Sequence, residues 1–185
     1  MDFIKKINKE EIKLHGLKKI TKYMLLFMAT SIIGWIYEEI LFLIQFGKET
    51  NRGFFYGPYL PVYGVGAILV TNVLKKYKKN PILIFILSMF LAGFLEWLVG
   101  FMVYEIWDKR LWDYEGEFLN IDRFVCLKSA ISFGFCGILI IYFLEPIINN
   151  FTYRISKKHD VIINIIIPII LIIDLLFVLI YRYPI

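Results

Sequence analysis

The stretch Ile162–Tyr181 reads IINIIIPIILIIDLLFVLIY, and all but three of its 20 residues are apolar. A helix needs about 20 apolar residues to cross the hydrocarbon core of a bilayer. Four earlier stretches are also long and apolar enough: Tyr23–Phe46, Phe54–Val73, Ile82–Trp107 and Phe124–Leu144. These runs are continuous, whereas the strands of a membrane β-barrel give short alternating segments. We therefore expect an all-α, polytopic integral membrane protein with about five transmembrane helices.

The composition of the 185-residue chain supports this class. Hydrophobic residues make up 59% of the chain, and the mean hydropathy is +0.67. Soluble domains are about 45–50% apolar even when glycine is counted, and disordered chains are less hydrophobic still. The net charge of +5 fits lysines and arginines in membrane loops, so we expect the lipid bilayer as partner and no nucleic acid.

The distribution of lysine and arginine predicts the orientation. Residues 1–22, 75–79 and 154–158 hold 14 of these residues on one predicted side of the membrane, against six on the other. Such an excess is typical of cytoplasmic loops. The sequence therefore predicts a plasma-membrane protein with a cytoplasmic N-terminus and an external C-terminus. Residues 1–22 form a basic, amphipathic cytoplasmic segment in this interpretation, and residues 23–185 form the transmembrane domain.

The second predicted span is irregular. Gly53–Gly66 contains two prolines and four glycines in 14 residues, a composition that kinks or breaks a helix. We predict that the span is not a straight helix between Gly57 and Gly64. Broken backbone at membrane depth is tolerated where it is buried in protein or lines a cavity. The segment is therefore either a kinked packing helix or a cavity wall.

Charged residues inside the predicted spans mark candidate functional positions, because such charges are rare and costly there. They are Glu38, Glu39, Glu96, Glu105, Lys128 and Asp174. In the predicted orientation all six fall at the midplane or in the outer half of the membrane. Glu38 and Glu96 share helix faces with small residues, which face other helices or a cavity rather than lipid. We infer an outward-facing polar pocket among the first four spans, containing Glu38, Glu96 and Lys128.

Cations and aromatic residues supply the other candidates for this pocket. Arg52 and Arg123 lie at its predicted rim, and Tyr63 lies on the irregular second span. Most aromatic residues cluster toward the outer side, as in an ordinary interfacial belt. Trp35 and Trp97 lie deeper, beside the glutamates, and are the better pocket candidates. The alternative is a buried Glu–Lys network that only fastens the helices.

Several kinds of chemistry are not expected. The sequence has no Gly-rich phosphate loop, H-E-x-x-H or G-x-S-x-G motif. His15 and His159 fall in predicted cytoplasmic segments. Cys126 and Cys136 lie too far apart on one predicted helix to form a disulfide, and we expect them to be packing residues. We therefore expect no cofactor, no metal site and no Ser–His or Cys–His nucleophile. Acid–base work by the carboxylates stays open, although the sequence does not favour an enzyme.

The stretch from Gly34 to Gly137 resembles the ABC-transporter type IV, or CmpB-like, membrane family. The residues that carry the resemblance are Gly34-Trp35 with Glu38, Asn51-Arg52-Gly53-Phe54, Gly57-Pro58, Pro61-Val62-Tyr63-Gly64, Glu96-Trp97, and Asn120 through Cys126-Leu127-Lys128 with Gly134. Asp122 or Arg123 stands where the family pattern has glycine. The resemblance implies a permease that uses a separate ATPase, since the sequence has no ATP site. It also implies a partner subunit or a homo-oligomer, because five spans are few for a translocation pathway.

Three functions remain open from the sequence. The first is a transport-related protein that binds a small polar or cationic solute in the outer pocket. The second is a membrane enzyme that acts on a lipid or envelope substrate, with Glu38 or Glu96 as base. The third is a structural or accessory subunit whose charges only fix helix packing.

Overall fold

The structure is a computed structural model that describes residues 12–47 and 53–182. Its helices are α2 (Leu17–Phe46), α3 (Pro61–Leu74), α4 (Pro81–Trp107), α5 (Leu127–Leu139), α6 (Glu145–Arg154) and α7 (Lys157–Phe177). A 3₁₀ turn, η1 (Lys75–Tyr77), follows α3, and π-helical turns follow α5 (η2, Ile140–Leu144) and α7 (η3, Val178–Arg182). The described part of the chain contains no β-strand beyond one isolated bridge.

Among the described residues, four helical segments are long and apolar enough to cross a membrane: Leu17–Ile44, Pro81–Trp107, Leu127–Arg154 and Lys157–Arg182. The all-α, polytopic membrane class is thereby confirmed. The fourth predicted span ends ten residues too early, because the helix runs through η2 and α6 to Arg154. The π turn ends two residues before Pro146, whose missing amide removes a regular helical hydrogen bond.

The predicted break in the second span is confirmed. Gly53–Leu60 is not helical, and α3 begins at Pro61, whose fixed φ suits the first helical position. With 14 residues, α3 rises only about 21 Å, less than the roughly 30 Å of a bilayer core. Asp174 of α7 accepts hydrogen bonds from the amides of Tyr56 and Gly57, at 3.0 and 2.8 Å. This carboxylate therefore satisfies irregular backbone that a bilayer would leave without partners.

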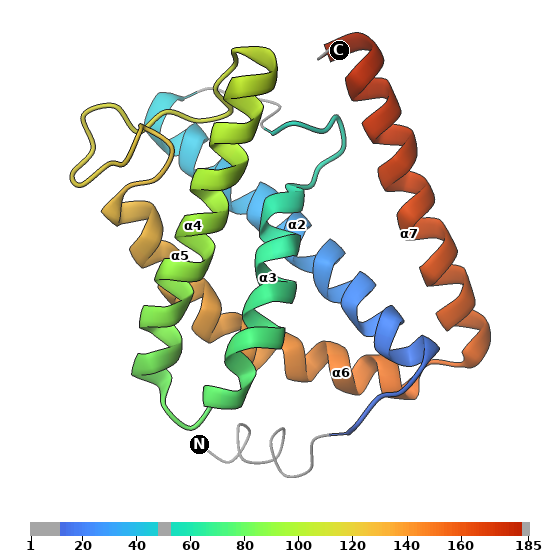
Figure 1. The fold of residues 1–185 in the computed structure, drawn as a ribbon. Helices are drawn as coiled ribbons and strands as arrows, with labels where there is room; N and C mark the ends of the chain where they lie inside the picture. Colours follow the sequence, from blue (N-terminus) through green and yellow to red (C-terminus); the bar gives the residue numbers. More distant parts are fainter. Residues whose placement is uncertain (1–11, 48–52, 183–185) are drawn as a thin grey trace.

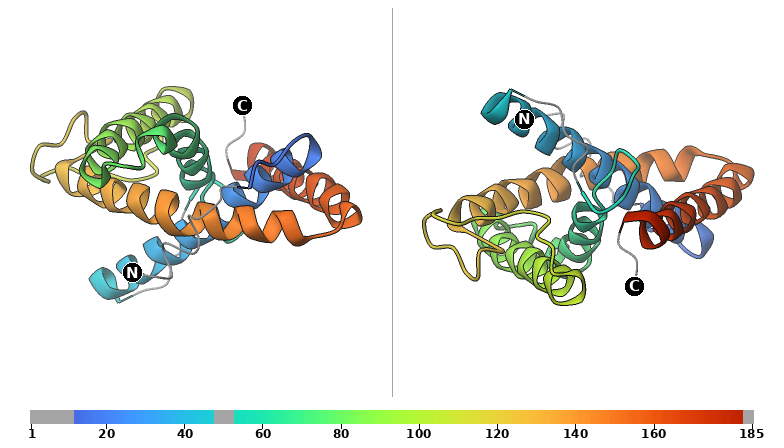
Figure 2. Two further views of the ribbon diagram at one scale, coloured as in Figure 1. Left: turned by 90° about the horizontal axis from the view of Figure 1, so that it is seen from below. Right: turned by 90° about the horizontal axis from the view of Figure 1, so that it is seen from above.

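The helices alternate between two ends of the molecule (Figure 1). The lysine-rich end comprises residues 12–22, 74–81 and 149–160. The loop end comprises the 53–60 segment, the 108–126 loop and the end of α7. Helices α2, α4 and α7 run from the lysine-rich end to the loop end, and α3 and α5–α6 return. Seen along this axis, α5–α6 extends obliquely across the molecule, with α7 at one side next to α2 (Figure 2).

The most extensive helix–helix contacts are those of α2 with α3 and of α4 with α5. Glycines allow both approaches. A Cβ at Gly64 would lie 2.7 Å from the backbone oxygen of Phe27 in α2. A Cβ at Gly137 would lie 2.0 Å from the Ser88 hydroxyl in α4. The small residues on these faces therefore bring α2–α3 and α4–α5 into contact, as helices in membranes commonly do.

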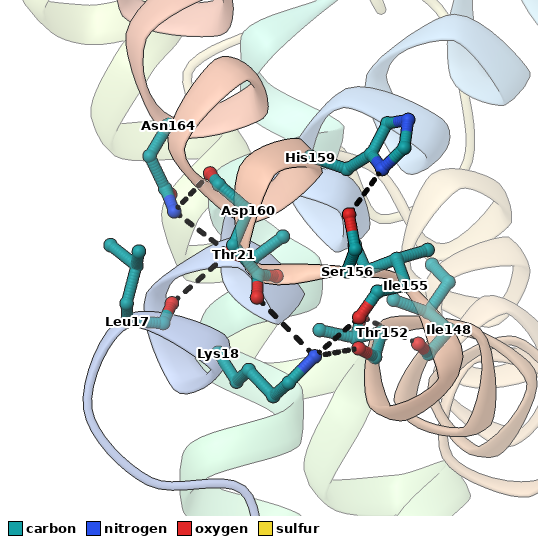
Figure 3. A network of polar contacts seen from close by, with 10 residues as sticks. All are labelled: Leu17, Lys18, Thr21, Ile148, Thr152, Ile155, Ser156, His159, Asp160 and Asn164. Carbon is teal, nitrogen blue, oxygen red and sulfur yellow. Dashed lines mark hydrogen bonds and ion pairs between the residues drawn. The ribbon is translucent and has the colours of Figure 1, made fainter.

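A polar network fixes α7 at the lysine-rich end (Figure 3). Lys18 of α2 forms an ion pair with Asp160 at 3.3 Å and donates to the Thr152 carbonyl of α6 at 2.9 Å. Asn164 of α7 donates to the Thr21 hydroxyl of α2 at 2.7 Å. Asp160 is only 1% exposed. One lysine therefore ties three helices together.

Candidate functional site

A cavity of about 250 Å³ lies between α2, α3, α4 and α5, and the 108–126 loop covers it. It is lined by Tyr37, Glu38, Leu41, Phe42, Val62, Tyr63, Glu96, Trp112, Asp113, Tyr114, Glu117, Lys128, Ser129, Ser132, Phe133 and Cys136. The structure thus brings four of the candidate residues to one cavity: Glu38, Tyr63, Glu96 and Lys128. The first four of the five predicted spans all contribute to its wall.

Glu96 is the most buried acid of this cavity, with 6% of its surface exposed. The Ser129 hydroxyl of α5 donates to Glu96 Oε2 at 2.8 Å. The Tyr114 hydroxyl of the 108–126 loop donates to Glu96 Oε1, also at 2.8 Å. Buried carboxylates need such donors, because the loss of water would otherwise be costly. Glu96 therefore links α4, α5 and the loop at the cavity wall.

Glu38 reaches the same cavity from α2. The Tyr63 hydroxyl of α3 donates to Glu38 Oε1 at 2.8 Å. The Tyr63 ring lies against Gly34, where a Cβ would come within 2.4 Å of a ring carbon. Gly34 therefore makes room for the tyrosine that orients Glu38. Two carboxylates from different helices consequently line one small cavity.

The 108–126 loop is held in place by charge and backbone contacts. Arg123 pairs with Asp113, and with Glu115 at 2.7 Å. The Tyr114 amide donates to the Arg123 carbonyl at 3.0 Å. Hydrogen bonding from Arg123 lowers the pKa of Asp113 to about 2. Burial, together with the charge of Glu96, raises the pKa of Tyr114 well above its usual value. The tyrosine therefore stays a hydroxyl donor to Glu96.

The loop contains two adjacent non-glycine residues with positive φ. Asp122 and Arg123 have φ values of 53° and 68°, in the left-handed region that favours glycine. Two residues with side chains therefore stand where the backbone takes the shape that glycine adopts without strain. Arg123, which has this strained backbone, also forms the ion pairs with Asp113 and Glu115.

Lys128 lies at the mouth of the cavity. Its side chain is 77% exposed, and its Nζ lies 3.8 Å from Glu117 Oε1. Lys128 therefore lines the cavity from its exposed edge, and its side chain is not buried beside the glutamates. The residue lies in the first turn of α5, where a long side chain reaches water.

The remaining candidates do not line the cavity. The Trp97 indole donates to Asp122 at 2.9 Å, and its ring stacks on Phe101 at 5.4 Å. Arg123 is engaged by the acids of its own loop. Trp35 is half-buried on α2, and Arg52 lies outside the described residues.

Sequence reasoning missed the hydroxyls that hold Glu96. Tyr114 lies in a loop, where hydropathy carries no signal. Cys126 and Ser129 cap the start of α5 reciprocally, and a serine three residues after the residue that caps a helix start is a pattern visible in the sequence. The Ser129 hydroxyl then faces Glu96 of α4. A second omission is Glu145, one residue beyond the predicted fourth span. It is 2% exposed and pairs with Lys22 at 2.5 Å and Lys75 at 2.7 Å.

The geometry suits binding of a cation or of hydrogen-bond donors by carboxylates. Within residues 12–47 and 53–182, no three His, Cys, Asp or Glu side chains gather as metal ligands would. His159 hydrogen-bonds to Ser156 at the start of α7, at the lysine-rich end. Neither histidine lines this cavity.

Comparison of the chain with known proteins identifies its family. The protein family described as "Putative ABC-transporter type IV" matches residues 25–179. Neither the curated proteins nor the solved structures gave a match. The family match confirms the resemblance drawn from the motifs, and it covers well over half of the chain. The chain therefore belongs to this family, and it is a multi-pass, transport-related membrane protein.

Proposed function

We propose that the protein binds a small polar or cationic solute in the cavity lined by Glu38 and Glu96. The observation that carries the proposal is the convergence of these two carboxylates, from α2 and α4, on one cavity. Carboxylates inside a membrane protein mark solute or ion pathways, because their burial is costly. Hydroxyl donors hold both of them in place.

The size of the cavity restricts the solute. Sites for drug-sized ligands occupy about 300–1,000 Å³, whereas this cavity holds about 250 Å³. A compact ammonium, guanidinium or polyhydroxyl compound fits both this volume and the acceptor oxygens.

The setting of the cavity follows from the same proposal. The lysine-rich end faces the cytoplasm of a cell whose plasma membrane holds the protein, so the 108–126 loop and the cavity face outward. The residues 1–22 then form the basic cytoplasmic segment. A separate ATPase or transporter subunit, or a second copy of this chain, completes the translocation pathway.

Thermal unfolding of the purified chain in detergent tests the binding. Guanidinium chloride at non-denaturing concentration and choline chloride serve as probes, with sodium chloride at equal ionic strength as reference. A solute that binds only the folded state stabilises it by RT ln(1 + L/Kd), where L is the free solute concentration, so the Tm rises as L increases. We expect one of the probes to raise the Tm of the wild type, and Glu38→Gln and Glu96→Gln to abolish that rise.

Two matched variants control for charge. Glu39→Gln neutralises the neighbouring acid on α2, and Glu105→Gln neutralises an exposed acid on α4. Neither residue lines the cavity, so both variants should retain the response. A response lost equally in the control variants would contradict the proposal. If neither probe shifts the wild type and Glu96→Gln only lowers its Tm, the carboxylates fasten helices and do not bind these cations.

A further inference from the structure

A second cavity, of about 550 Å³, lies at the lysine-rich end, away from the carboxylate cavity. We name it the basic cavity. It is lined by Ile12, Lys13, Leu14, His15, Gly16, Lys19, Lys22, Tyr23, Thr71, Asn72, Lys75, Lys76 and Asn149. Five of these residues are lysines, and none is acidic.

Only part of this positive charge is compensated. Glu145 pairs with Lys22 and Lys75. In the described part of the chain, no carboxylate lies within ion-pair distance of Lys13, Lys19 or Lys76. The side chains of Lys19 and Lys76 are exposed at the cavity. The cavity therefore carries an excess of several positive charges in one concave place.

The wall of the basic cavity also contains a polar atom that lacks a partner. Thr71 is 3% exposed, and its hydroxyl makes no hydrogen bond within the described structure. Buried hydroxyls are nearly always satisfied, so such an atom calls for an explanation. A hydroxyl beside lysines is a suitable donor to an anionic oxygen.

The cavity is built rather than a chance gap between side chains. The Asn149 amide of α6 donates to the Ile12 carbonyl at 3.0 Å, which fixes the 12–16 segment beside α6. The Tyr23 hydroxyl donates to Asn72 at 2.5 Å, which joins α2 to α3. Three parts of the chain are thus held around the lysines.

We infer that the basic cavity is a binding site for a phosphate-bearing anion, recognised by Lys19, Lys76 and the Thr71 hydroxyl. Basic pockets between transmembrane helices at the cytoplasmic side suit the phosphate of anionic lipid headgroups. A free phosphate compound offers the same oxygens. The site is separate from the carboxylate cavity, so the inference does not depend on the proposed solute.

Binding by the full-length purified chain in detergent tests this inference. One arm titrates mixed micelles of phosphatidylglycerol against phosphatidylcholine, and the other titrates inorganic pyrophosphate without lipid. A lysine near an anionic surface contributes roughly fivefold to affinity, so the double variant Lys19→Gln/Lys76→Gln should bind about 25-fold more weakly. Thr71→Val, of nearly the same shape, should also weaken binding. It should not lower the Tm without ligand, because the hydroxyl that it removes has no partner in the described structure.

The control is Lys157→Gln/Lys158→Gln, which removes the same charge at the same end. Both lysines are exposed at the start of α7 and do not line the cavity. Phosphatidylglycerol binding without pyrophosphate binding would identify the anion as a lipid headgroup, and pyrophosphate binding would identify a free phosphate compound. Equal losses in the two double variants would overturn the inference, because they would show surface charge alone. If neither probe binds, the inference is overturned as well. The lysines would then serve to bind an acidic protein partner.

Discussion

Neutralising Glu145 should destabilise the protein more than neutralising any exposed acid. Glu145 is 2% exposed and accepts from Lys22 and Lys75, whose side chains are only 11% and 19% exposed. Glu145→Gln removes this shared carboxylate from both ammonium groups in a place with little water. Breaking a buried ion pair from one side costs about 3–5 kcal/mol. For a chain of this length that corresponds to a fall in Tm of about 6–20 °C.

The assay is thermal unfolding in one detergent, followed by tryptophan fluorescence. Glu117→Gln is the matched control, since Glu117 and its partner Lys128 are 43% and 77% exposed, and exposed pairs contribute at most about 1 kcal/mol. Adding Lys22→Gln to Glu145→Gln should restore part of the loss, because one uncompensated charge is removed. If Glu145→Gln costs no more than Glu117→Gln, the reasoning from burial is refuted.

Three further predictions concern helix contact and the 108–126 loop. Gly137→Ala should lower the Tm, because its Cβ would meet the Ser88 hydroxyl at 2.0 Å, whereas Gly93→Ala meets nothing closer than 3.6 Å and should not. Arg123→Gly should be about 1 kcal/mol more stable than Arg123→Ala, since both lose the ion pairs but only glycine suits the positive φ; a more stable alanine variant would disprove the strain. Because the pKa of Asp113 is lowered to about 2, the loop should keep its hydrogen-exchange protection at pH 5 and lose it as the pH falls from about 4 toward 2. Asp113→Asn should lack that protection already at pH 5, and equal protection in the two chains would show that the pair does not hold the loop.

The fold was predictable wherever hydropathy and length carry the information. The apolar runs gave the long helices, and Pro58 and Pro61 gave the break before α3, because proline removes amide donors regardless of the surroundings. The extension of α5 through α6 was not predictable in this way. The EPIINNFTYR stretch of α6 is polar, and it stays helical because Glu145, Asn149 and Thr152 pack inward at the lysine-rich end.

The carboxylate cavity was partly predictable for a similar reason. Charge inside a span, with small residues on the same face, placed Glu38 and Glu96 together. Hydropathy does not report what a loop covers, so Tyr114 and Trp112 could not be found. Depth along a helix does not report the side-chain direction, so Lys128 was placed inside although it lies at the mouth. The role of Asp174 as an anchor for the 53–60 backbone depends on a contact across 117 residues of sequence, which no local pattern contains.

The central claim is that the cavity among α2, α3, α4 and α5 holds a solute. A structure of the protein extracted with its native lipid tests this most directly. We expect non-protein density within hydrogen-bond distance of the Glu38 or Glu96 carboxylate, and its loss in Glu96→Gln while the helices keep their places. Carboxylates that face lipid, or a cavity closed by protein side chains alone, would contradict the claim.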